Sequence, residues 1–165
     1  MIRIELKEEA LVAGLARLSA GLDDMTPVMN QIGEYLITST KKRFGKGVDP
    51  DGNPWAANSP VTLARKKGTR PLFGESNQLN TQIFHEAGPT QVEVGSPMVY
   101  AGVQQFGAAQ GEFGAFIGKD KKGRDHFHSI PWGDVPARPF IGVSEEDETA
   151  LTKIVEVYLA GLVQP

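Results

Sequence analysis

The chain has 165 residues, with 17 Lys and Arg against 20 Asp and Glu, a formal net charge of −3, and no cysteine. This length suits one domain, which buries about 70% of the surface that the unfolded chain exposes and needs no disulfide or metal to form a core. The lack of cysteine excludes disulfide frameworks, Cys-ligated metal centres and thiol catalysis. The near balance of charge argues against a protein that coats nucleic acid. No stretch approaches the roughly 18–20 apolar residues of a membrane span, so we expect a protein of a reducing compartment with no membrane partner.

The first part of the chain predicts one strand followed by two helices. Apolar and polar residues alternate over residues 2–6, which is typical of a strand with one buried face. Leucines then recur at helical spacing from Leu11 to Leu22. Thr26 and Pro27 form a helix start, and the second helix ends before Gly45.

The middle and the end of the chain predict shorter elements. Residues 45–74 are interpreted as a loop with one short helix capped by Ser59. Residues 79–86 and 91–95 predict a hairpin, and Pro97 begins another short helix. After an extended run over 136–143, Ser144 caps a last helix with an acidic, solvated first turn at 145–148.

The fold expected from these elements is a single α+β domain over residues 1–165. A small, mostly antiparallel sheet is packed by the two N-terminal helices and the C-terminal helix, with long inserted loops. Residues at about 107–135 are rich in glycine and lack sustained periodicity. We interpret them as a protruding Gly-rich arm or hairpin that orders on meeting a partner.

Tests for catalytic and metal motifs give negative or weak results. Asp49 begins a calcium-loop-like sequence, but Pro54 and Pro60 occupy its sixth and twelfth positions, so a tight Asx-type turn presenting Trp55 is favoured. His126 and His128 would point the same way on a strand and form half of a zinc site. Asp125 and His85 are the third ligands open to them, and a metal-dependent hydrolase is the weakest hypothesis. No nucleophile elbow or phosphate-binding loop occurs, so we expect no enzyme and no cofactor.

Charge is unevenly distributed along the chain. Residues 41–70 hold eight basic and two acidic residues, a net charge of +6, and the rest of the chain therefore sums to −9. This division favours either head-to-tail docking between copies or contact with a phosphate backbone. A nucleic-acid-binding module that uses the basic 41–70 segment is accordingly the alternative function.

Basic and aromatic residues of this segment and of the arm are the candidates for an interface. They are Lys41, Lys42, Arg43, Lys46, Trp55, Arg65, Lys66, Lys67, Phe113, Phe116, Lys121, Lys122, Arg124 and Trp132. Trp55 and Trp132 have two interpretations, as lids over the core or as anchors between subunits. Arg138 is expected to hold a carboxylate, either within the fold, which we favour, or across an interface.

An ordered series of short motifs runs through most of the chain, from about residue 35 to residue 160. It comprises Arg43-Phe44, Asp49-Pro50-Asp51-Gly52-Asn53-Pro54-Trp55, Ser59-Pro60-x-Thr62, Pro71-Leu72-Phe73-Gly74, Val92-Glu93-Val94-Gly95, Tyr100-Ala101, Gln105-Phe106-Gly107 and Pro136-Ala137-Arg138-Pro139-Phe140-Ile141-Gly142. This series resembles the phage virion-morphogenesis family of tailed phages, which includes the tail-completion proteins of the protein G type in Mu-like phages.

The resemblance implies a structural virion protein without catalytic residues. Such a subunit forms a ring at the neck of the virion, completes or terminates the tail, and docks it to the head–tail connector after assembly in the host cytoplasm. The implied partners are further copies of the chain, in a ring expected to be sixfold because tail tubes of this kind usually are, together with the tail-tube and connector proteins. DNA passing through the lumen is an implied passive contact.

Overall fold

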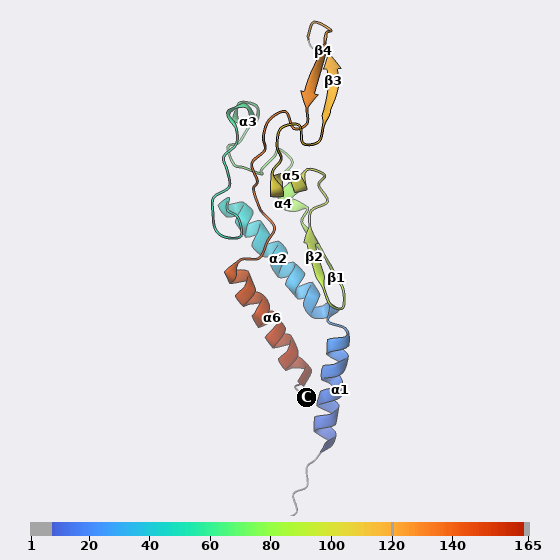
Figure 1. Ribbon diagram of the computed structural model, residues 1–165. Coiled ribbons are helices and arrows are strands. Elements are labelled where there is room, and N and C mark those ends of the chain that lie inside the picture. The colour runs from blue at the N-terminus through green and yellow to red at the C-terminus, as the bar shows by residue number, and fades with distance from the viewer. Residues whose placement is uncertain (1–7, 120, 164–165) are drawn as a thin grey trace, which may run out of the picture. The chain divides into compact units, whose positions relative to one another are not determined.

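The computed structural model describes residues 8–119 and 121–163 (Figure 1). Six helices and two two-stranded sheets occur in this described part of the chain. In order they are α1 (Glu8–Asp23), α2 (Thr26–Lys46), α3 (Pro60–Arg65), α4 (Gln78–Thr81), β1 (Phe84–Ala87), β2 (Val92–Gly95), α5 (Ala101–Phe106), β3 (Ala115–Lys119), β4 (Asp125–Ser129) and α6 (Glu145–Val163).

The predicted α+β class is confirmed, with its extended structure divided between two antiparallel hairpins, β1–β2 and β3–β4. The predicted long helices and the capped short helix α3 are also confirmed. Two boundaries were wrong. Residues 78–81 form a helical turn that buries Leu79, so the strand begins only at Phe84, and the helix expected from Pro97 begins at Ala101. The predicted strand at 2–6 lies outside the described residues.

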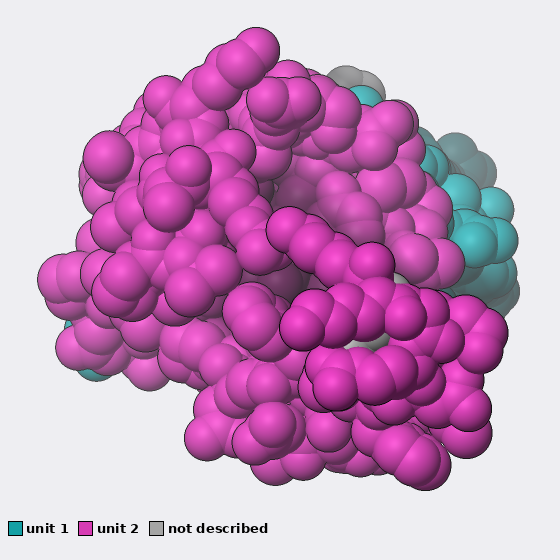
Figure 2. Space-filling model, turned by 90° about the horizontal axis from the view of Figure 1, so that it is seen from above, with its two compact units in different colours: residues 1–39, 84–94, 143–165 teal, residues 40–83, 95–142 magenta. Residues whose placement is uncertain are grey.

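The chain divides into two compact units (Figure 2). Unit 1 comprises residues 1–39, 84–94 and 143–165, and unit 2 comprises residues 40–83 and 95–142. The boundary falls inside α2 and again inside β2, so neither unit is a continuous piece of sequence. That the whole chain is one domain stays a prediction.

In unit 1, α1 packs against α6 through small residues and backbone carbonyls. A Cβ atom on Gly21 would lie 2.4 Å from the Leu162 side chain, so a larger residue there would require that side chain to move. The Tyr158 hydroxyl donates to the Gly21 carbonyl at 2.9 Å. The β1–β2 hairpin packs on α2 in the same way, because the His85 ring lies where a Cβ atom of Gly33 would be.

A reciprocal pair of hydrogen bonds begins α6. The Asp147 amide donates to the Ser144 hydroxyl at 3.1 Å, and the Ser144 amide donates to the Asp147 carboxylate at 3.0 Å. This is a capping box with Asp in the place of Glu, and it satisfies two amides that the helix leaves unpaired. The prediction that the whole acidic first turn is solvated was therefore wrong for Asp147, which is buried.

Unit 2 has an aromatic core centred on Phe44, at the C-terminal end of α2. Its ring meets Trp55 and Phe140 edge-on, with centroids 5.2 and 5.4 Å away, and Phe73 lies 6.0 Å away. Phe44 and Phe140 are fully buried. The Asx turn predicted before Trp55 is confirmed, since the Asn53 amide donates to the Asp49 carboxylate at 2.8 Å.

The extended segment 136–142 runs through unit 2 with polar side chains as its hydrogen-bond partners. The Gln105 carboxamide accepts from the Phe140 and Ile141 amides and donates to the Ile141 carbonyl at 2.7 Å. Arg43 donates to the Gly142 carbonyl at 2.7 Å. Side chains thus replace the neighbouring strand that a buried extended backbone normally needs.

Replacing Phe44 by Ala is expected to destabilise the protein by about 3–5 kcal/mol, because the substitution leaves a cavity among three aromatic rings. The matched control is Phe106→Ala, which removes a ring that is 80% exposed and should change the free energy of unfolding by less than about 0.5 kcal/mol. Urea denaturation followed by tryptophan fluorescence measures both. Equal losses for the two variants would contradict the position of this core.

Candidate interaction surface

Residues 107–119 and 121–135 form a hairpin whose base, here called the root, is closed by backbone hydrogen bonds. Ala108 and Val135 exchange two backbone hydrogen bonds, of 2.9 and 2.8 Å. Gly107 has φ +78°, and a Cβ atom there would lie 2.8 Å from the Val135 carbonyl oxygen, so the root requires glycine. Further backbone bonds join Phe113 to Ile130 and Ile130 to Gly114. β3 and β4 pair antiparallel within this segment, whereas the protrusion of the arm and its ordering on meeting a partner stay predictions.

Beyond these bonds, β3 and β4 pair in antiparallel register and present two different faces. Phe116 opposes His128 and Gly118 opposes His126 on one face, where Phe116 stacks on His128 with ring centroids 4.9 Å apart. Ile117 opposes Phe127 on the other face. These two side chains are 61% and 70% exposed, so neither face is covered by the described part of the chain. Ile117 and Phe127 were missed as candidates, although the alternation along each strand marks them.

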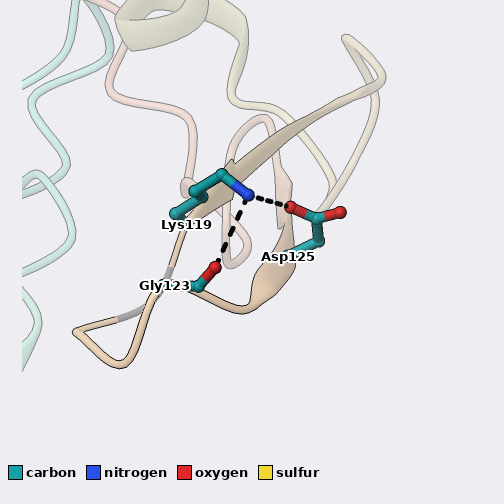
Figure 3. Close-up of polar contacts among 3 residues, drawn as sticks. All are labelled: Lys119, Gly123 and Asp125. Carbon is teal, nitrogen blue, oxygen red and sulfur yellow. Dashed lines mark hydrogen bonds and ion pairs between the residues drawn. The ribbon is translucent and has the colours of Figure 1, made fainter.

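The tip of the hairpin is basic and closed by an ion pair. The Lys119 ammonium lies 3.0 Å from the Asp125 carboxylate and 3.5 Å from the Gly123 carbonyl oxygen (Figure 3). This pair fixes the two strand ends opposite each other, and both side chains are about 70% exposed, so it adds little stability by itself. Lys121, Lys122 and Arg124, all candidates, lie exposed in the connecting turn.

The basic candidates outside the arm lie in two places. Lys41, Lys42 and Lys46 are exposed on the last turns of α2. Arg65, Lys66 and Lys67 lie at the end of α3, where Lys66 donates to the Arg70 carbonyl and Lys67 lies 3.8 Å from Glu75. The pKa of Lys66 is lowered, mainly by partial burial and to a smaller extent by the nearby positive charge of Arg138.

Two interface candidates instead form part of the interior of unit 2. Arg43 is 6% exposed and donates to the Thr40 hydroxyl and the Gly142 carbonyl. Trp55 is 7% exposed and its indole N–H donates to the Pro139 carbonyl at 2.7 Å. Their contacts bind the core together, so of the two interpretations given for Trp55 the core position is the one observed.

Trp132, unlike Trp55, lies on the surface. It is 66% exposed, and the Arg65 guanidinium lies 5.9 Å from its ring centroid. It lines an open cleft of about 500 Å³ together with Ala57, Asn58, Ser59, Val61, Thr62, Gln104, Pro131, Gly133, Asp134, Val135, Pro136 and Arg138. The start of α3 and the residues that lead back from the arm, 131–136, therefore lie on the same cleft.

Arg138 is held by backbone carbonyls where a carboxylate was predicted, so that prediction was wrong. Its guanidinium donates to the carbonyls of Ala56 at 2.7 Å and Ala57 at 2.9 Å. Burial lowers the pKa of this group, which remains a cation because arginine titrates far above neutrality. Arg138 is therefore a structural clamp between the segment 136–142 and the loop before α3.

The histidines do not form a metal site with other ligands in the part of the chain described. His126 and His128 lie edge to face, with ring centroids 4.7 Å apart, but no group of three or more metal-ligating side chains occurs among the described residues. Neither Asp125, which pairs with Lys119, nor His85, which lies 3.2 Å from Asn30, joins them. None of the helices described is both long and apolar enough to cross a membrane.

The uneven charge follows the division into units. Unit 1 contains 4 Lys and Arg against 13 Asp and Glu, a net charge of −9, and unit 2 contains 13 against 7, a net charge of +6. The basic arm tip and the basic 41–70 segment belong to the same unit. Each copy therefore offers one positive and one negative body to other molecules.

Replacing Arg138 by Lys is expected to cost about 1–3 kcal/mol of stability, because an ammonium cannot reproduce the planar fork that donates to both the Ala56 and the Ala57 carbonyl. Arg65→Lys is the matched control, since Arg65 is exposed and a Lys keeps the positive charge near Trp132. Thermal unfolding of both variants measures the difference. An Arg138→Lys variant as stable as the control would contradict the clamp.

Comparison with known proteins gives one result that covers nearly the whole chain. The model of the phage virion morphogenesis family matches residues 6–160. No curated protein and no solved structure matches the chain. The match spans both units, the arm and the motifs on which the resemblance rests. The chain therefore belongs to the phage virion morphogenesis family and is a structural protein of bacteriophage virion assembly.

Proposed function

We propose that this protein is a neck subunit that forms a ring at the head–tail junction, terminates the tail and docks it to the connector. Membership of a virion morphogenesis family supports the assembly role. The observation that supports a ring is the arm, which exposes apolar side chains on both faces of a two-stranded hairpin. Such a hairpin is only marginally stable in water, and exposed apolar patches of this kind mark protein interfaces.

The opposite charges of the two units support a contact between unlike surfaces. A ring requires that each subunit present one surface to the neighbour on one side and a different surface to the other. Bodies of +6 and −9 attract each other between copies and repel their own kind, as the unlike surfaces of this head-to-tail arrangement require. The partners proposed are further copies of the chain, the tail-tube protein and the connector.

The test is size-exclusion chromatography with light scattering, on the chain alone and mixed with the tail-tube protein of the same phage. We expect a closed oligomer of defined mass, or one that appears only in the mixture. A phage that lacks the protein should accumulate DNA-filled heads and separate tails, visible by negative-stain microscopy. A chain that stays monomeric in both samples, from a phage whose tails still join heads without it, would refute the proposal.

Binding to nucleic acid is a second candidate function, favoured by the exposed Lys41, Lys42 and Lys46 in a unit of charge +6. If it operates, affinity for duplex DNA should fall steeply with salt, with a logarithmic slope of about −0.9 for each phosphate contacted. Fluorescence anisotropy from 50 to 200 mM salt measures this slope. The variant Lys41→Ala/Lys42→Ala should flatten it, whereas negligible binding at low salt removes this candidate.

A further inference from the structure

Helix α1 has an apolar stripe that its own unit leaves uncovered. Leu11, Val12, Leu15 and Leu22 are 46–64% exposed although their spacing is that of a buried helix face. α6 packs on a different side of α1, where Gly21 and Arg17 meet Leu162. At 100° per residue, the stripe is centred roughly 140° around the helix from that contact. The stripe is therefore a separate surface.

The stripe begins at an acidic end. Glu8 and Glu9 occupy the first turn of α1, and both are exposed. They belong to the unit whose net charge is −9. A partner matched to this surface would carry apolar side chains beside a basic end.

The arm has the apolar side chains and the adjacent basic end that such a partner would need. Ile117 and Phe127 form its more exposed face, and the basic turn with Lys121, Lys122 and Arg124 follows directly. The opposite face is partly satisfied within the arm, since Phe116 stacks on His128. The Ile117 face is therefore the one that most needs an external cover.

We propose that the Ile117 face of the arm of one copy docks on the α1 stripe of the next copy, with the basic turn beside Glu8 and Glu9. The proposal rests on the proposed ring and names its contact. The lengths agree: from Leu11 to Leu22 the helix rises about 16 Å, at 1.5 Å per residue. A strand of five residues such as β3 spans about 13 Å from its first to its last Cα atom, at 3.3 Å per residue, which is most of that length.

This contact has the symmetry that a ring requires. Each copy donates one arm and receives one on α1, so the same pair of unlike surfaces repeats around a rotation axis. Apolar burial supplies the affinity, and the opposite charges set the direction in which the arm lies along the helix. The marginal hairpin gains its missing cover in the same step.

The absence of cysteine from the chain makes site-directed disulfide formation a direct test. Full-length Ile117→Cys and Leu15→Cys variants are mixed under the conditions of the assembled state, alone or with tail-tube protein, and oxidised. Docked thiols within disulfide reach should link two chains at least roughly tenfold faster than thiols that meet only by collision. The readout is a dimer band on a non-reducing gel.

Two matched controls define the faces. Ala13→Cys lies on the opposite side of α1 from Leu15, and Phe116→Cys lies on the opposite face of the arm from Ile117. Both control residues are exposed, as Leu15 and Ile117 are. Only the Ile117 and Leu15 pair should link rapidly. An oligomer in which this pair links no faster than the controls overturns the docking and leaves the ring standing. Failure to assemble with itself and with tail-tube protein overturns both proposals.

Charge reversal provides a second test that does not depend on cysteine geometry. Lys121→Glu/Lys122→Glu should weaken assembly by about tenfold or more, because like charges then meet across the contact. Adding Glu8→Lys/Glu9→Lys in the same chain should restore it, whereas Lys41→Glu/Lys42→Glu, which lowers the charge of unit 2 by the same amount outside the arm, should weaken assembly clearly less. Equal weakening by both lysine pairs, or no rescue by the added reversals, would overturn the proposed register.

Discussion

The interior of unit 2 depends on one constraint, the need to satisfy the backbone of the extended segment 136–142. A buried peptide group without a partner costs as much as a lost hydrogen bond. No strand lies beside this segment in the described structure, so Gln105, Arg43 and Trp55 bond to its peptide groups. Arg138, within the segment, clamps the loop that precedes α3. These bonds tie together four stretches that are far apart in sequence and hold Phe140 against Phe44.

The arm projects directly from this clamped region. Its root closes at Ala108 and Val135, the residues that follow α5 and precede the extended segment. The base of the hairpin is therefore fixed by backbone hydrogen bonds, while β3 and β4 expose both faces. An element that is rigid at its root and uncovered at its tip suits a contact made between subunits, since little conformational entropy remains to be lost when it docks.

Charge and apolar surface have different roles in the proposed assembly. Charges of −9 and +6 on the two units act over about 8–10 Å at physiological salt, so they orient copies as they approach. The exposed leucines of α1 and the exposed Ile117 and Phe127 of the arm act only at contact and supply the larger share of the free energy. A surface that combines both can select one neighbour and one direction.

The sequence by itself determined the local structure and the family. Helix periodicity, the caps at Ser59 and Ser144, and the Asx turn at Asp49 are local effects, and the ordered motifs identify the family without a fold. The tertiary structure alone decided which polar and aromatic residues are internal. Arg43 and Asp147 look like surface residues in sequence, and Trp55 has two interpretations, but all three are buried, where a carbonyl distant in the chain or a helix cap bonds to them. The exposure of the α1 leucines could not be predicted from the sequence either. Periodicity marks an apolar face, but only the packing of the chain determines what covers that face.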